Sequence, residues 1–126
     1  MIHVDTNLLI ASVDRSHEHA SLWPGLVAAG ESFAASAVAW TEFRSYPISS
    51  NQLLALEQLL PGGIVAYERA HADLAGELFR MTKSKRKNRL DSMIAATAIL
   101  AGAKLATVDQ ADFKAFVTFG LKLYQF

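Results

Sequence analysis

Five acidic residues lie among apolar or small neighbours and are the candidates for chemistry in this chain: Asp5, Glu42, Asp91, Asp109 and Asp112. If their carboxylates converge, the like charges raise the pKa of some of them unless a cation lies between. The hard cations Mg²⁺ and Mn²⁺ are the ions that all-oxygen clusters bind. One such ion makes hydroxide available near neutral pH, and a second would stabilise a leaving oxygen. The set therefore indicates metal-assisted displacement at phosphorus, which needs no Ser, Cys or His nucleophile.

Each aspartate of this set also has a simpler structural explanation. Asp5 and Asp109 could cap the N-termini of the helices that follow them. Asp91 could be a first-turn carboxylate favoured by a helix dipole, and Asp112 could complete a capping pair with Asp109. Convergence of the carboxylates would decide between the two explanations, because capping does not require it.

Glu42 is harder to explain without a function. It stands in a helical, largely apolar run beside Trp40 and Phe43, where burial without a partner is costly. The alternative is a solvated stripe shared with Arg44. Small polar residues close to the acids could orient waters or carboxylates, and these are Thr6, Asn7 and Thr107.

A basic strip covers residues 80–89, RMTKSKRKNR, and holds six of the twelve Lys and Arg residues. The rest of the chain is acidic in balance. Such strips can hold a phosphate backbone, and a loop kept soluble by its charge is the alternative. The strip ends two residues before Asp91, so we expect its loop near the acids. The candidates for nucleic-acid contact are Lys83, Lys85, Arg86, Lys87 and Arg89.

Short β-prone runs alternate with helical runs along the chain. We expect strands at 2–4, 32–36, 63–67, 104–108 and 121–126, and helices at 8–14, 17–30, 37–46, 51–60, 67–83, 90–102 and 110–116. Pro24 should kink or divide the second helix. The alternation predicts an α/β fold with a parallel sheet covered by helices on both faces. Ligands bind beyond the carboxyl ends of such strands, where strand order reverses, so Asp5 and Asp109 can meet if their strands are neighbours.

Length and composition bound the class of protein. The 126 residues fit a single domain, 1–126. The absence of cysteine excludes a disulfide framework and thiol catalysis, and agrees with a reducing cytoplasm. The opening MIHVD has a carboxylate where a secretory signal needs apolar residues, and no apolar run approaches the roughly 20 residues of a membrane helix. We therefore expect a cytoplasmic protein with no membrane partner.

Four segments in this order resemble the PIN-domain ribonucleases: VDTNLLIA near the N-terminus, Glu42 in an apolar helix, RLDSMIAATAILAG, and LATVDQADF. The chain length is similar to that of the VapC toxins of toxin–antitoxin pairs. One residue departs from the pattern, because His3 stands where an apolar or aromatic residue is expected.

The resemblance implies a fold, a reaction and partners. The fold is a three-layer α/β/α sandwich with a parallel sheet of four to five strands. Metal ligation is assigned to Asp5, Glu42, Asp91 and Asp109, with Asp112 as a fifth acid at the edge. The implied reaction is Mg²⁺- or Mn²⁺-dependent endonucleolytic cleavage of single-stranded or looped RNA, often transfer RNA, and the basic strip would contact that RNA. The implied partners are a second copy in a homodimer and a cognate VapB-like antitoxin.

Two rival functions remain open at this stage. The first is an aspartate-based phosphotransfer enzyme with Asp5 as nucleophile. Such enzymes usually have a second Asp shortly after the first and a Lys near the later acids, whereas here DTN lacks the second Asp and Lys104 lies at the start of its strand, before the later acids. The second rival is a catalytically silent module of the same fold that binds RNA or an antitoxin. The intact set of acids argues against that module.

Overall fold

The computed structural model describes residues 1–83 and 88–126. Its strands are β1 (Ile2–Val4), β2 (Phe33–Ser36), β3 (Ile64–Val65), β4 (Lys104–Ala106) and β5 (Lys122–Leu123). Its helices are α1 (Thr6–Val13), α2 (Trp23–Ala28), α3 (Ala37–Arg44), α4 (Ser50–Leu59), α5 (Arg69–Met81), α6 (Arg89–Ala101) and α7 (Gln110–Val117), with a short 3₁₀ helix, η1 (Ala20–Leu22), before α2. Three residues of the predicted basic strip, Lys85, Arg86 and Lys87, lie outside the described residues.

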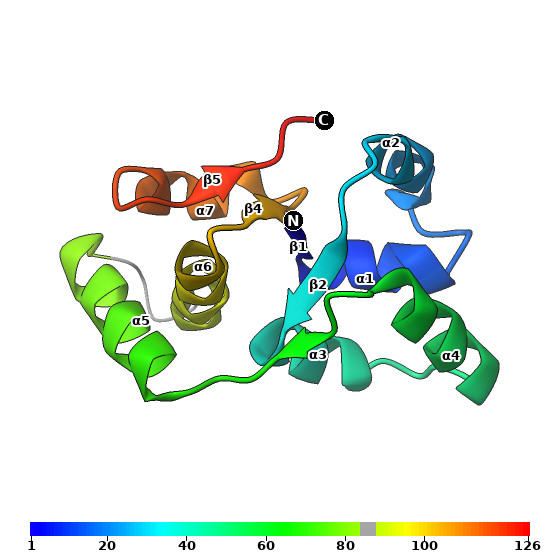
Figure 1. Cartoon of the computed structure of the whole chain (residues 1–126), viewed down its shortest axis with the longest axis horizontal. Helices are drawn as coiled ribbons and strands as arrows, with labels where there is room; N and C mark the ends of the chain where they lie inside the picture. Colours follow the sequence, from blue (N-terminus) through cyan, green and yellow to red (C-terminus); the bar gives the residue numbers. More distant parts are fainter. Residues whose placement is uncertain (84–87) are drawn as a thin grey trace.

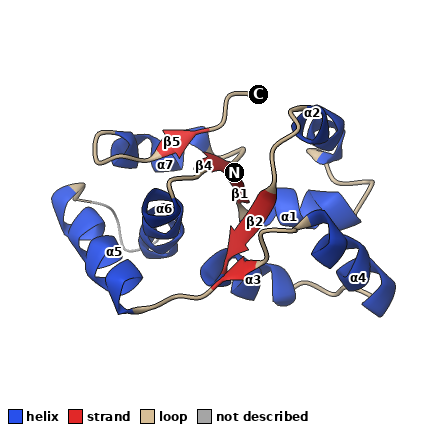
Figure 2. Ribbon diagram, viewed as in Figure 1, coloured by secondary structure: helices blue, strands red, loops and turns tan. Residues whose placement is uncertain are grey.

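Within the described residues, the five strands form one parallel sheet in the order β3–β2–β1–β4–β5 (Figures 1 and 2). The chain builds outward from β1 to β3 and then returns to the other side of β1 with β4 and β5. Strand order therefore reverses between β1 and β4, where Val4 pairs with Ala106 at the carboxyl ends. The condition under which Asp5 and Asp109 can meet, that their strands are neighbours, is therefore fulfilled, and a ligand site is expected at this point.

Helices lie on both faces of the sheet, which confirms the three-layer α/β/α sandwich. Figure 1 shows α1, α2 and α4 on one side of the sheet and α5 and α6 on the other. All three residues of β1 are buried, because this central strand is covered from both sides. The largest fully buried side chains of the surrounding helices include Leu8, Leu9, Phe43 and Ile94.

The helix predicted over 17–30 forms as two short pieces, η1 and α2, which confirms the predicted interruption. Pro24 is the second residue of α2, where a missing N–H breaks no helical hydrogen bond. One predicted element was too long. The predicted last strand, 121–126, has only Lys122 and Leu123 in β5, although the Tyr124 N–H still donates to the Leu105 carbonyl at 2.8 Å.

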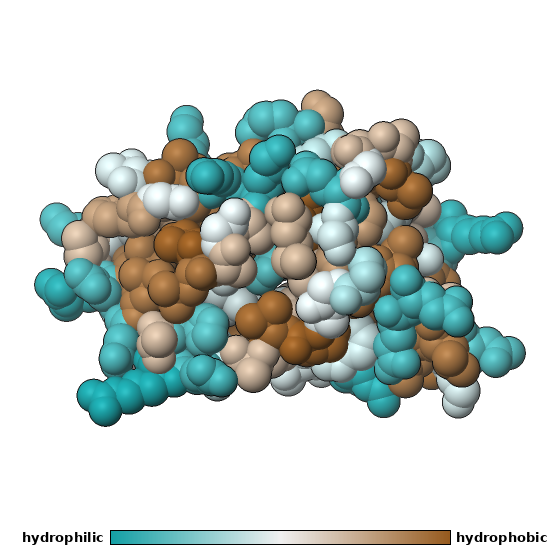
Figure 3. All heavy atoms as spheres, viewed as in Figure 1, coloured by the Kyte–Doolittle hydropathy of each residue, from teal (hydrophilic) through white to brown (hydrophobic). Residues whose placement is uncertain are grey.

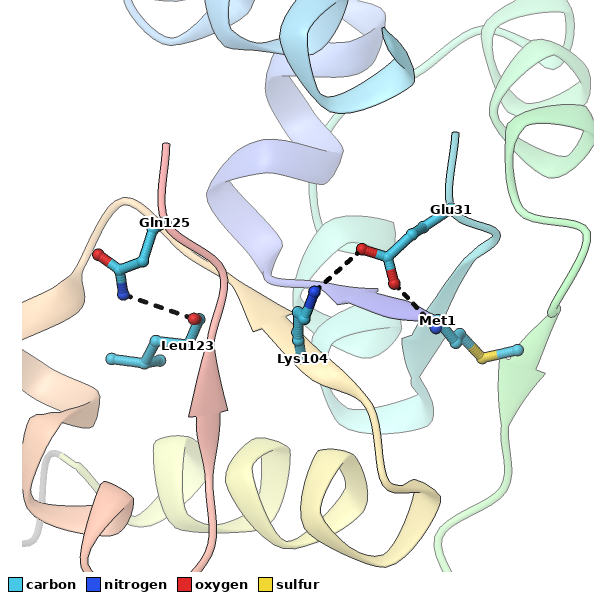
Figure 4. A network of polar contacts seen from close by, with 5 residues as sticks. All are labelled: Met1, Glu31, Lys104, Leu123 and Gln125. Atoms are coloured by element: carbon cyan, nitrogen blue, oxygen red, sulfur yellow. Dashed lines mark hydrogen bonds and ion pairs between the residues drawn. The ribbon is translucent and has the colours of Figure 1, made fainter. Parts of the chain in front are cut away.

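A polar network closes the amino-terminal edge of the sheet (Figure 4). The Glu31 carboxylate accepts from the ammonium of Met1 at 3.2 Å and from Lys104 Nζ at 3.3 Å. Met1 precedes β1, Glu31 lies before β2, and Lys104 begins β4, so the network lies at the strand ends opposite to Asp5. None of the helices in residues 1–83 and 88–126 is long and apolar enough to cross a membrane.

Candidate active site

Asp5 directly follows β1, and only 5% of its surface is exposed. Its Oδ1 accepts from the Thr6 N–H at 2.8 Å, and its Oδ2 accepts from the Thr107 hydroxyl at 2.7 Å. The first bond makes Asp5 the N-cap of α1, so the capping explanation holds for one oxygen. Capping does not explain the second bond, which comes from the residue that follows β4.

Thr6 and Asn7, the first two residues of α1, each hold a further carboxylate. The Thr6 hydroxyl donates to Glu42 Oε1 at 3.1 Å, and the Asn7 amide donates to Asp109 Oδ2 at 2.9 Å. The start of α1 is thereby joined to the middle of α3 and to the turn after β4. The predicted role of Thr6 and Asn7 as neighbours of the acids agrees with these contacts.

Asp91 lies in the first turn of α6 and is half-buried. Its burial raises the carboxyl pKa to about 7, and four negative charges contribute in the same direction, those of Asp5, Asp112, Glu42 and Asp109. The other four carboxylates are therefore near enough to Asp91 to act on it electrostatically.

The pKa of Asp5 is raised to about 6, and burial is the largest cause. The hydrogen bonds from Thr107 and Thr6 lower this pKa, whereas the charges of Asp109 and Glu42 raise it. Near neutral pH the cluster therefore retains protons that a nearby cation would displace.

The donor set fits a hard cation in its chemistry, since every candidate ligand is a carboxylate oxygen. The repulsion that raises the pKa of Asp5 and Asp91 is the kind that a bound cation removes. In residues 1–83 and 88–126, however, no three His, Asp or Glu side chains lie close enough together to hold a metal ion as they stand. Asp112 is exposed and lies outermost, in the first turn of α7.

The capping pair expected between Asp109 and Asp112 was wrong. Asp109 is the N-cap residue of α7, but its side chain makes no capping bond and instead accepts from Asn7. Asp112 meets Asp109 only through its backbone N–H, at 3.0 Å. Glu42 is half-buried and bonded to Thr6, so it does not simply occupy a solvated stripe.

Two of the five candidates for nucleic-acid contact are among the described residues. Lys83, after α5, and Arg89, at the start of α6, are both exposed. The Arg89 guanidinium lies over the Phe79 ring, 4.8 Å from its centroid.

Gln110 is a positioning residue that the sequence analysis did not single out. Its side-chain amide donates to the Thr107 carbonyl at 2.9 Å, and the Thr107 hydroxyl accepts from the Asp109 N–H at 3.0 Å. Together these bonds hold the turn that carries Asp109. A glutamine at the start of a helix is usually solvated, so its sequence position alone carries no signal for this role.

Residues 2–117 match the PIN domain family. The chain belongs to the PIN domain family. The resemblance drawn from the four sequence segments is thereby confirmed. Comparison with curated proteins found no match.

Solved structures share the fold of this PIN domain over nearly its whole length. A chain of VapBC2 from Rickettsia felis, bound to a promoter DNA fragment, has a TM-score of 0.75 at 21% identity, and the match covers 100% of this chain and 99% of that one. A chain of FitAcB from Neisseria gonorrhoeae has a TM-score of 0.71 at 20% identity, with 99% and 97% covered. A chain of a toxin–antitoxin complex from Klebsiella pneumoniae has a TM-score of 0.69 at 24% identity, with 90% of each chain covered.

Proposed function

We propose that this PIN-domain protein is a divalent-metal-dependent endoribonuclease and the toxin of a toxin–antitoxin pair. The observation that carries the proposal is the raised pKa of two carboxylates from different elements, Asp5 at the reversal of strand order and Asp91 in the first turn of α6, with the charge of Asp5 acting on Asp91. Buried like charges with raised pKa values at a strand-order reversal are typical of functional sites.

Asp5, Glu42, Asp91 and Asp109 are the proposed metal ligands, and Asp112 is a fifth acid at the rim. When bound, Mg²⁺ or Mn²⁺ would supply Lewis acidity toward water and phosphate. The protein's own groups orient the donors. Hydroxyl and amide donors hold three of the carboxylates in place, and these donors are Thr107 for Asp5, Thr6 for Glu42 and Asn7 for Asp109. Within the described residues the Asp91 carboxylate makes no hydrogen bond, and its pKa of about 7 means that a bound cation would displace a proton from it near neutral pH.

The proposed substrate is single-stranded or looped RNA, with transfer RNA as the first class to test. Lys83 and Arg89 are exposed and would contact its backbone, together with Lys85, Arg86 and Lys87, which lie outside the described residues. The proposed protein partners are a second copy and a VapB-like antitoxin. Their support is that the similar solved structures are VapBC, FitAcB and toxin–antitoxin complexes. A cytoplasmic setting remains a prediction.

The contacts argue against the phosphotransfer rival. Lys104 pairs with Glu31 at the opposite edge of the sheet and is too far from Asp5 to assist such a step. If the wild-type chain does not bind Mn²⁺ in the test below, the catalytically silent binding module becomes the expected function.

Calorimetric titration of Mn²⁺ into the purified protein tests the proposal without a guess at the substrate. We expect binding by the wild-type chain and its loss in Asp5→Asn and Asp91→Asn. The matched control is Asp73→Asn, because Asp73 is an exposed carboxylate on α5 paired with Arg69. Asp5→Asn and Asp91→Asn should also lose cleavage of a transfer RNA pool, and Asp73→Asn should keep it. Equal Mn²⁺ binding by Asp5→Asn and Asp73→Asn would overturn the ligand assignment.

A further inference from the structure

A cavity of about 340 Å³ lies between α5 and α6 and is not part of the acidic site. Its walls are largely apolar, and they include the rings of Tyr67 and Phe79 and the side chain of Met93. Figure 3 shows apolar surface over α5 and α6, and exposed apolar side chains of these helices are Met81, Leu90 and Leu100. The volume is in the range of small-ligand sites.

Arg89 gives this apolar cavity a charged edge. Its guanidinium stacks on Phe79, 4.8 Å from the ring centroid, and the residue is exposed. The Ser92 hydroxyl, which also borders the cavity, donates to the Arg89 carbonyl at 2.6 Å and steadies the first turn of α6. An aromatic ring with a stacked guanidinium presents both a π-face and a positive charge.

The first turn of α6 carries both this cavity and one of the acids. Arg89 and Met93 are four residues apart and lie on the helix face toward α5. Asp91, two residues after Arg89, points to a different face, where the charges of Asp5 and Glu42 act on it. A single strand that crosses the N-terminus of α6 can therefore reach the cavity and the acids together.

We propose that this cavity binds one nucleobase of the RNA, next to the nucleotide that is cut, while Arg89 contacts the adjoining phosphate. This inference rests on the proposed function. Aromatic walls match a base, since every base has a π-face, and stacking on protein rings is how single strands are held without sequence-specific bonds. A cation is needed here because the neighbouring carboxylates repel phosphate, and Arg89 supplies it.

Gly76 allows the cavity to be filled without disturbing the fold. It lies in the middle of α5 and borders the cavity, and a Cβ built on it meets no atom within 4 Å. Replacing a helical glycine by leucine also favours the helix. Gly25→Leu is the matched control, because Gly25 lies in α2, on the other side of the sheet, with the same open space around its Cβ.

The test is fluorescence anisotropy in EDTA, where no cleavage occurs, with a labelled mixed-sequence RNA of about ten nucleotides and an abasic strand of equal length. We expect Gly76→Leu to weaken RNA binding about tenfold relative to Gly25→Leu and to leave abasic binding unchanged. Arg89→Gln should weaken binding of both strands, because it removes a phosphate contact.

Equal RNA affinity of Gly76→Leu and Gly25→Leu would overturn the inference, as would an absence of RNA binding by the wild-type chain. Neither result decides the metal-ligand assignment, which the Mn²⁺ titration tests separately. Sedimentation of both variants tests whether a second copy of the chain occupies the cavity instead of a base. A dimer that becomes a monomer only in Gly76→Leu would show that a second copy fills the cavity, and would also overturn the inference.

Discussion

The hydroxyl of Thr107 donates to Oδ2 of Asp5 at 2.7 Å and joins the carboxyl ends of two adjacent strands, 102 residues apart in sequence. Thr107 is completely buried. This bond favours the ionised form of Asp5 and opposes the burial that raises its pKa. The orientation of the most deeply buried acid therefore depends on a neutral residue of a different strand.

Thr107→Val should weaken both the fold and the site. The variant keeps the shape of the side chain but leaves the Asp5 carboxylate and the Asp109 N–H without their partner, at a cost of about 1–3 kcal/mol of unfolding free energy. The pKa of Asp5 should rise further, so Mn²⁺ affinity should fall at pH 6.5. Urea unfolding and calorimetry measure these two effects. Thr41→Val is the control, since the exposed Thr41 hydroxyl bonds only to the Ala37 carbonyl of its own helix.

Asp5 and Asp91 should each lower the stability of the metal-free protein as the pH rises through the range from about 4 to about 7, against the opposite contribution of His3 below pH 6.5. The pKa of Asp5 is about 6 and that of Asp91 about 7, both raised from the ordinary value of 3.8. Between the ordinary pKa and the raised pKa of each acid, the folded chain binds more protons at that acid than the unfolded chain does. The contribution of each acid to stability therefore falls with increasing pH. For buried Asp5 the loss is on the order of 2 kcal/mol.

Urea unfolding in EDTA at pH 5.5 and pH 8 checks this dependence. Asp5→Asn should flatten it and should be the more stable protein at pH 8, because the repulsion is gone. Mn²⁺ should stabilise the wild-type protein at pH 8 and not this variant. Parallel pH curves for the two proteins would contradict the prediction.

His3→Leu should stabilise the protein. The His3 side chain is buried in the central strand, and neither ring nitrogen has a hydrogen-bond partner within the described structure. Burial lowers the pKa of His3 to about 4, so the ring stays neutral and desolvated at pH 7. Leucine avoids that cost, and we expect a gain of about 1 kcal/mol.

The gain from His3→Leu should grow as the pH falls from 6.5 toward 4. In that range the unfolded chain binds a proton at this histidine and the folded chain does not. His3 therefore lowers the free energy of unfolding of the wild-type protein as the pH falls, and the leucine variant has no such loss. His71→Leu is the contrasting variant. The His71 ring accepts from the Glu68 N–H at the start of α5, so its loss should destabilise the helix. A His3→Leu protein less stable than wild type at pH 7 would show that the ring has a partner.

Glu31→Gln should reduce stability slightly at pH 7 in low salt. The hydrogen bond from the Met1 ammonium, followed by that from Lys104, holds the pKa of Glu31 below its usual range. The stability that these two bonds contribute is therefore present near neutral pH and is lost in acid. Because all three groups are partly exposed, salt should screen the effect, and the variant should match wild type at about 1 M salt. Glu77→Gln, at an exposed site on α5, is the control for thermal unfolding.

Local signals in the sequence determined most of the elements. The capping residue Ser49 forms a reciprocal capping box with Gln52, and Gly102 ends α6 with a φ of 64°, as a C-terminal glycine should. Alternation of strands and helices predicted the parallel sheet, and the apolar surroundings of Asp5 and Glu42 marked them as candidates. These features depend on a residue and its near neighbours in sequence, which is why they are readable without a structure.

The tertiary structure alone decided the partners of the acids and formed the cavity between α5 and α6. Thr107 meets Asp5, Asn7 meets Asp109 and Thr6 meets Glu42 across 102, 102 and 36 residues of chain. Such pairings depend on strand order and helix packing, which place distant segments together and which no local rule specifies. The sequence by itself determined which residues are acidic and that Asp5 directly follows the first strand. The packing of the strands brought the acids close enough for their charges to raise the pKa of Asp91. Carboxylates perturb one another in this way only when folding removes them from water and brings them together.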